Sequence, residues 1–140
     1  MRILGLDYGE VRIGVAVSDP LGITALPLSF IENNDRAFSC IIDLIKQYQV
    51  GKIVVGNPIK MDGSIGAAAE KARMFSEALK NQIKADVDLW DERLTTKMAQ
   101  RSYLDLGVSQ KRSRKNIDST SASLMLQGYI DRKNNEKLHN

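Results

Sequence analysis

Residues 2–19, RILGLDYGEVRIGVAVSD, contain the pattern that decides the fold. An apolar run ends at Asp7, and a second run of alternating apolar and small residues follows the link YGEV. Two such runs around a short glycine-containing link predict a β-hairpin. A dinucleotide-binding loop is excluded here, because the first strand leads into a second strand and not into a helix. Asp7 therefore stands where a buried strand meets open space.

The rest of the chain alternates strand and helix patterns. A third predicted strand, TALPLSFI (24–31), contains Pro27, which favours a sheet edge or a strand end. From Asn34, the expected N-cap, apolar residues recur at helical spacing. The later elements are predicted as a strand at 51–58, a helix with Ala68, Ala72, Phe75 and Leu79 on one face, a strand at 85–93, a helix from Thr95 or Thr96 to Leu106, and a last helix with Ala122, Met125, Leu126, Tyr129 and Ile130 on one face.

This order of elements predicts an α/β fold. The expected core is a mixed five-stranded sheet, an antiparallel meander of three strands plus two parallel strands, flanked by helices. A chain of 140 residues fits a single domain, 1–140, with a flexible tail from about residue 134. Sheets of this kind place their sites beyond the carboxyl ends of their strands.

Composition and charge narrow the class of protein. Lys and Arg number 20 against 17 Asp and Glu, a net charge of +3, which permits a polyanionic partner. No apolar run approaches the roughly 20 residues of a membrane span, and the amino terminus lacks the order of a secretory signal. Cys40 has no partner for an internal disulfide and is expected as a buried thiol. We therefore expect a cytoplasmic protein without membrane contact.

Three carboxylates from distant parts of the chain end or begin predicted elements. Asp7 ends the first strand, Glu92 ends the strand VDLW with Asp91 before it, and Asp118 lies four residues before Ala122 on the apolar face of the last helix. Alternation along a strand sends Asp91 and Glu92 to opposite faces. For Asp118, the competing interpretation is that it caps the last helix. For Asp91 and Glu92, the competing interpretation is that one of them pairs with Arg93 or caps the next helix.

Clustered carboxylates repel one another unless a cation lies between them. Hard oxygen ligands suit Mg²⁺ or Mn²⁺, and two such ions can activate a water and stabilise the leaving oxygen of a phosphodiester. The only histidine is His139, in the tail, so a zinc site and a Ser–His–Asp triad are unsupported. The three acids therefore predict a metal-dependent hydrolase of phosphodiesters.

A basic stretch, KRSRK (111–115), precedes Asp118, and its positive charges suit the binding of a polyanion. The alternative interpretation is a solvated surface loop, because most short runs of charged residues lie on such loops. Arg12 is a further candidate, either for substrate contact or for pairing with a neighbouring acid. The full set of expected substrate-binding residues is Arg12, Lys60, Lys97, Lys111, Arg112, Arg114 and Lys115.

Four ordered motifs carry a resemblance to a known family. LDYGEVRIGVAVSD, VGNPIKMDGS, LWDERLTT and IDSTSASLMLQGYID together resemble the YqgF/RuvX family of bacterial Holliday junction resolvases and pre-16S ribosomal RNA nucleases, in the RNase H-like superfamily. The resemblance implies an RNase H-like fold, a divalent-metal nuclease with Asp7, Glu92 and Asp118 as its acids, and trimming of the 5′ end of the 16S rRNA precursor. Asn57 and Ser121 depart from the family pattern.

Three other functions compete with an rRNA nuclease. A Holliday junction resolvase would use the same acids on branched DNA, because both substrates present similar phosphates. An RNA-binding factor of ribosome assembly would keep the basic stretch without catalysis. A phosphotransferase of the actin and sugar-kinase type has a similar hairpin but needs two lobes, for which the chain is too short. The oligomeric state stays open.

Overall fold

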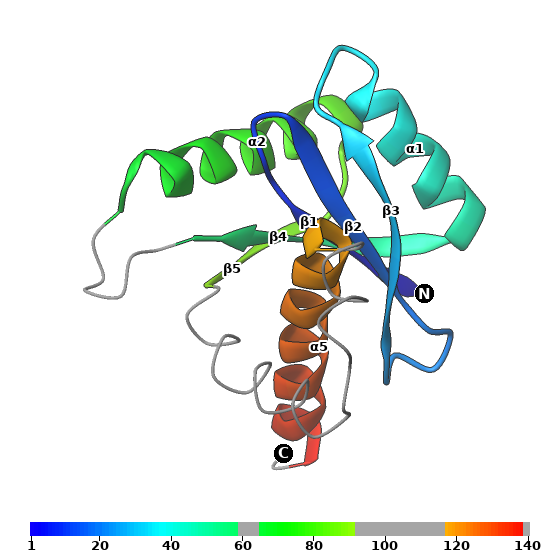
Figure 1. The fold of residues 1–140 in the computed structure, drawn as a ribbon. Coiled ribbons are helices and arrows are strands. Elements are labelled where there is room, and N and C mark those ends of the chain that lie inside the picture. The colour runs from blue at the N-terminus through cyan, green and yellow to red at the C-terminus, as the bar shows by residue number, and fades with distance from the viewer. Residues whose placement is uncertain (59–64, 92–116, 139–140) are drawn as a thin grey trace.

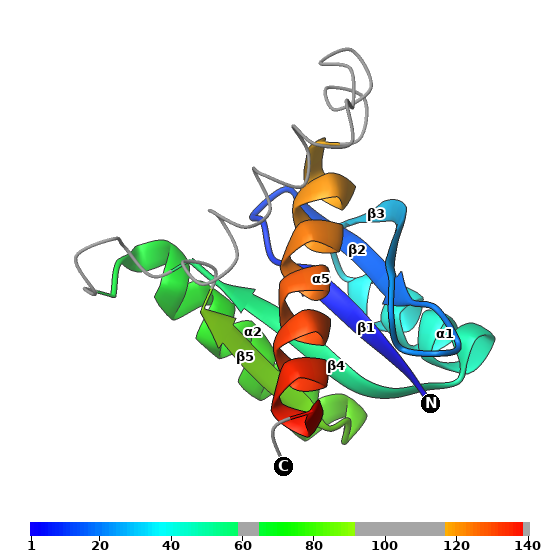
Figure 2. The ribbon, with the colours of Figure 1, turned by 90° about the horizontal axis from the view of Figure 1, so that it is seen from below.

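The computed structural model describes residues 1–58, 65–91 and 117–138, with side chains of the last helix from Ser121 to Lys137. These residues form a five-stranded sheet with a helix on one face and two on the other (Figures 1 and 2). The elements are β1 (Arg2–Asp7), β2 (Arg12–Ser18), β3 (Ala25–Glu32), α1 (Ala37–Tyr48), β4 (Val50–Asn57), α2 (Ala67–Ile83), β5 (Val87–Asp91) and α5 (Ile117–Leu138).

The sheet has the order β3-β2-β1-β4-β5, so β1 is its central strand. β1 pairs antiparallel with β2, and β2 pairs antiparallel with β3. β4 lies parallel to β1, and β5 lies parallel to β4. The predicted meander of three strands plus two parallel strands is confirmed. Pro27 lies in β3, an edge strand of the sheet, where a missing N–H donor costs least.

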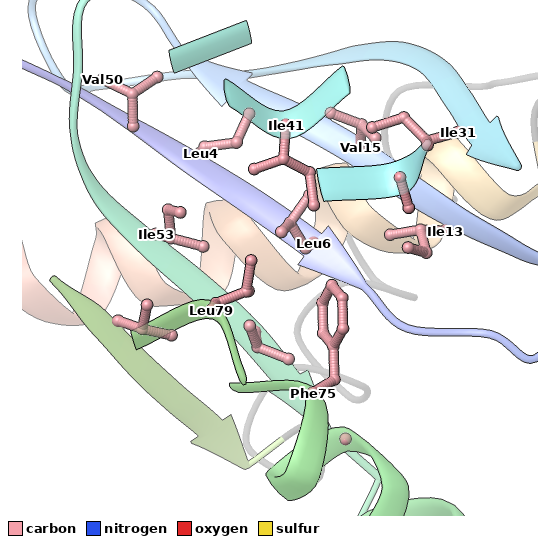
Figure 3. Packing of buried hydrophobic residues seen from close by; sticks show 14 of the residues in the cluster. Leu4, Leu6, Ile13, Val15, Ile31, Ile41, Val50, Ile53, Phe75 and Leu79 are labelled. Atoms are coloured by element: carbon pink, nitrogen blue, oxygen red, sulfur yellow. The ribbon is translucent and has the colours of Figure 1, made fainter. Parts of the chain in front are cut away.

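Alternation along β1 divides the core between the two faces of the sheet. Leu4 and Leu6 are fully buried against α1 and α2, in the cluster drawn in Figure 3. Ile3 and Gly5 point to the opposite face, which α5 covers. Both sheet faces of this strand are thus covered, which explains its almost continuous apolar sequence. The buried face of α5 has the predicted members, Ala122, Met125, Leu126, Tyr129 and Ile130.

Three local predictions were wrong. α1 begins at Ala37 with Arg36 as its N-cap, because Asn34 instead accepts the Arg36 backbone N–H with its side chain in a turn before the helix. Cys40 is exposed, since it lies on the solvent side of α1. Ala69, and not Ala68, joins the buried face of α2.

Two predicted segments lie outside the described residues: the helix from Thr95 or Thr96 to Leu106 and the basic stretch before Asp118. Most of the expected tail is helical, because α5 continues to Leu138. No helix within 1–58, 65–91 and 117–138 has the length and apolar character to span a membrane.

Gly5 allows α5 to approach the centre of the sheet. A Cβ atom built on Gly5 would lie 3.0 Å from Cβ and 3.3 Å from Cδ2 of Leu126. Gly5 is buried and Leu126 is fully buried, so the atoms in contact have no solvent side into which to move. Any side chain at this position therefore pushes α5 away from β1.

We expect Gly5→Ala to lower the free energy of unfolding by about 1–3 kcal/mol, the usual cost of overpacking a core. Leu126→Ala alone is expected to cost about 2–5 kcal/mol, because it leaves a cavity. The double variant removes the Cγ and Cδ2 contacts with the new methyl group but keeps the 3.0 Å contact between the two Cβ atoms, so it should cost somewhat less than the sum of the two. Urea unfolding of the four proteins measures this coupling, and strictly additive costs would contradict the contact.

Candidate functional site

Asp7 is the last residue of the central strand β1 and lies opposite Gly14 of β2. Its position continues the alternation of Ile3 and Gly5, so it belongs to the α5 face of the sheet. The side chain is partly buried. A carboxylate therefore lies at the carboxyl end of an inner strand, as the sequence predicted.

The first turn of α5, with Asp118, lies at the same end and on the same face as Asp7. Leu126 contacts Gly5 in the middle of β1. Farther along α5, the Asn134 amide donates to the Gly22 carbonyl in the turn between β2 and β3, where β1 begins. The helix therefore runs antiparallel to β1, and its start lies toward the carboxyl end of that strand (Figure 2). Asp118 precedes Ala122, which is buried against Ala16, by one helical turn.

Glu92 lies outside the described residues, directly after the end of β5. Within β5, Asp88 and Trp90 both contact Tyr129 of α5. Val87 lies in the core formed with α1 and α2, on the other face. The predicted alternation is thus confirmed for the described part of this strand, and Asp91 shares the face of Val87.

The link between β1 and β2 is held in place by contacts on both sides. The Asn33 backbone N–H donates to the Val11 carbonyl at 2.9 Å, and the Asn33 side-chain amide donates to the Gly9 carbonyl at 2.8 Å. Tyr8 packs on Phe75 of α2, with ring centroids 4.9 Å apart. A Cβ at Gly9 would lie 2.4 Å from the carbonyl oxygen of the residue that begins β2, so this tight link requires glycine. Asp7 is therefore followed by a fixed turn.

Arg12 begins β2, and its guanidinium lies over the ring of Phe30, 4.8 Å from the ring centroid. Phe30 lies in the edge strand β3 and is 46% exposed. The sequence pattern identified Arg12 but not Phe30, because an aromatic residue in a predicted strand is usually a core residue. Only the position of the ring beside a cation distinguishes it from ordinary strand residues.

The remaining predicted contacts with substrate lie outside the described residues: Lys60, Lys97, Lys111, Arg112, Arg114 and Lys115. Of the three predicted acids, Asp7 alone has a described side chain. Among the side chains that the structure describes, no group of three His, Cys, Asp or Glu residues is placed to hold a metal ion. For the other two acids, the structure describes the backbone of α5 at Asp118 and the end of β5 directly before Glu92.

A polar network ties α5 to the β4–β5 edge of the sheet. The Tyr129 hydroxyl donates to Asp88 Oδ2 at 2.8 Å, and Lys52 Nζ donates to the same oxygen at 3.2 Å. Burial raises the pKa of Tyr129 to about 12, and the hydrogen bond to Asp88 acts in the same direction. Burial also acts to raise the pKa of Asp88, but the hydrogen bonds from Tyr129 and Lys52 outweigh it and hold that pKa below its usual value.

This network predicts a loss of stability in alkali. The folded state holds the Tyr129 proton more tightly than the unfolded chain, whose tyrosine pKa is about 10. The contribution is complete below pH 10 and disappears as the pH rises toward 12, by about 1.4 kcal/mol for each pH unit in that interval. We expect urea unfolding of Tyr129→Phe to show a shallower decline over that range, from a lower starting stability. Parallel declines in the two proteins would contradict this assignment.

Known proteins resemble this chain both in sequence and in fold. A family model described as RuvX, Holliday junction resolvase, matches residues 1–132. The protein of Sulfurihydrogenibium sp. (strain YO3AOP1) named "Putative pre-16S rRNA nuclease" is 47% identical over 133 residues, covering 94% of this chain and 90% of the relative. A protein of the same name from Halothermothrix orenii is 45% identical over 141 residues, covering 99% of each chain.

Among solved structures, T. thermophilus RuvC in complex with Holliday junction substrate has a similar fold. The TM-score is 0.60 at 12% identity, over 95% of this chain and 96% of that chain. This likeness confirms the predicted RNase H-like fold. Together with the match over residues 1–132, it supports one conclusion: the chain belongs to the RuvX family.

Proposed function

We propose that this chain is a divalent-metal-dependent nuclease that hydrolyses phosphodiester bonds with the carboxylates of Asp7, Glu92 and Asp118. The observation that carries the proposal is the common location of Asp7 and the first turn of α5, at one end and on one face of the sheet. If the alternation of Asp88 and Trp90 continues by one more step of two residues, it assigns Glu92 to the same face. Three carboxylates would then surround the carboxyl end of β1.

The donor set suits Mg²⁺ or Mn²⁺. Carboxylate oxygens are hard ligands, and Asp7 is supported by a central strand whose two faces are covered. Two bound ions would supply a water activated for attack and positive charge beside the leaving oxygen. Asp7, Glu92 and Asp118 would hold these ions by charge, and the fixed link after Asp7 would keep the first carboxylate in position.

The substrate is best assigned as the precursor of 16S rRNA, cut near its 5′ end during ribosome biogenesis in the cytoplasm. Support comes from relatives at 45–47% identity whose names specify a pre-16S rRNA nuclease. A four-way DNA junction is the second candidate, because the family model is described as a Holliday junction resolvase. In both cases, Arg12, Lys60, Lys97 and the basic stretch before Asp118 would contact phosphates.

One purified preparation should be tested on three substrates: a precursor rRNA fragment spanning the 5′ end, a four-way DNA junction, and an unstructured single strand. Each reaction is run with Mg²⁺, with Mn²⁺ and with a chelator. We expect metal-dependent cleavage that is fastest on the rRNA precursor. Preference for the junction would favour a resolvase. Tight RNA binding without cleavage under any metal would overturn the nuclease and favour an assembly factor.

A further inference from the structure

Phe30 and Arg12 form an exposed aromatic and cationic pair at the edge of the sheet. Phe30 has 46% of its surface exposed, so part of its ring is open to a ligand. The Arg12 guanidinium covers part of this ring at 4.8 Å and is itself exposed. A flat aromatic face beside a planar cation is the arrangement with which proteins stack nucleic-acid bases.

Sheet register places Phe30 in the same transverse row as Asp7, with Arg12 two residues before that row on β2. Asp7 lies opposite Gly14 of β2. The β2–β3 register shifts between the pairs Ile13–Ile31 and Val15–Leu28, which leaves Ser29 and Phe30 opposite Gly14. Phe30 is therefore two strand spacings from Asp7, about 10 Å between backbones. The residue between them is a glycine, so no side chain of β2 separates the carboxylate from the ring.

Both members of the pair lie on the face of the sheet that carries Asp7. Ile13 and Ile31 are buried in the core against α1 and α2. Their neighbours Arg12 and Phe30 alternate to the opposite face, which α5 covers farther along the sheet. The Val11 and Gly9 carbonyls accept hydrogen bonds from Asn33, which joins the start of β2 to the end of β3. The pair is thus held on two connected strands beside the proposed site.

We propose that Phe30 and Arg12 form a stacking subsite for an unpaired base next to the phosphate being cut. This inference rests on the proposed function, because it takes the strand to pass Asp7. Phe30 provides the stacking face, and Arg12 covers the ring and contacts the flanking phosphate. Stacking on an aromatic ring tolerates every base, so the subsite selects unpaired nucleotides and not a sequence. The strand that is cut must then be single-stranded or unstacked at that position.

The test compares two ligands of equal charge: a short oligothymidylate and an abasic strand with the same number of phosphates. Affinities are measured with Mg²⁺ present in an Asp7→Asn background, so that neither ligand is consumed. We expect Phe30→Ala to weaken oligothymidylate binding by about 5- to 150-fold and to leave abasic-strand binding unchanged. Phe30→Trp should retain the preference for bases, whereas Phe30→Leu should lose it.

Leu26→Ala is the matched control, because Leu26 lies in the same edge strand and is 44% exposed. It should leave both affinities unchanged. The stacking role would be overturned if Phe30→Ala weakened the binding of both ligands equally, or if Phe30→Leu retained the preference for bases. The pair would then only support the sheet edge. The nuclease proposal is judged separately by cleavage with the unmodified protein. If binding depends on the bases through Phe30 but no substrate is cleaved, only the nuclease proposal is overturned. If substrate is cleaved but binding does not depend on Phe30, only the stacking subsite is overturned.

Discussion

Asp7→Asn is expected to reduce cleavage by about 1,000-fold or more while the protein stays folded. The substitution removes one ligand charge with little change in volume. Charge stabilisation by bound metal is worth several kcal/mol, and each 1.36 kcal/mol corresponds to about a factor of ten in rate. Loss of repulsion from the neighbouring acids should leave the thermal midpoint unchanged or raise it. Initial rates on the best substrate, together with thermal unfolding, measure both effects.

Asp91→Asn is the matched control for a carboxylate at a strand end. Asp91 ends β5, which belongs to the same sheet, but it lies on the face of Val87 and not on the face of Asp7. We expect its effect on cleavage to be small and that of Glu92→Gln to approach the effect of Asp7→Asn. If Asp7→Asn lowers stability together with activity, its carboxylate serves the fold. Equal losses from Asp91→Asn and Glu92→Gln would contradict the face assignment.

Sequence pattern predicted the sheet well because its strands carry strong local signals. The runs on either side of YGEV alternate over enough residues to specify a hairpin, and both strands pair as expected. Pro27 lacks a ladder donor, so its strand belongs at an edge, and β3 is at the edge. The stripe from Ala122 to Ile130 repeats at helical spacing, and each member is buried.

Local signals failed where the structure depends on neighbours far away in sequence. Ala68 and Ala69 are chemically identical, and only the rotation of α2 against the sheet determines which one is buried. Cys40 lies in a helix whose sheet-facing positions are taken by residues such as Ile41, so its low polarity does not bury it. The position of Phe30 in the row of Asp7 follows from an irregular β2–β3 register, which no spacing within one strand reveals.

The candidate site, too, could be predicted where local signals determine it and not where distant contacts do. Asp7 could be placed from sequence, because one apolar run and the hairpin after it fix the end of β1. The relation of Asp7 to Asp118 depends on the direction in which α5 crosses the sheet. That direction is set by contacts between residues far apart in the sequence, such as Gly5 with Leu126 and Gly22 with Asn134. Helical spacing alone determines the face of α5 but not its direction.

Replacing Lys111, Arg112, Arg114 and Lys115 with glutamine is expected to flatten the plot of log affinity against log salt by up to about 3 to 4 units. Each phosphate contact that a cation makes contributes roughly 0.9 or less to this slope, because it releases condensed counterions. The stretch leads directly into α5, whose first turn contains Asp118. We therefore expect these charges to contact a strand that is bound at the proposed site.

The matched control replaces Arg36, Lys46, Arg73 and Lys80, which removes the same number of Lys and Arg residues. These side chains are exposed on or beside α1 and α2, across the sheet from α5. Nucleic acid is titrated at several salt concentrations. The plot of log affinity against log salt should have its normal slope for this control and a shallower slope for the first variant. The first variant should lose a similar amount of affinity for all nucleic-acid sequences. Equal slopes in the two variants would mean that net charge alone attracts the polyanion. An unchanged slope with unchanged cleavage in the first variant would show that the strand reaches Asp7 from another side.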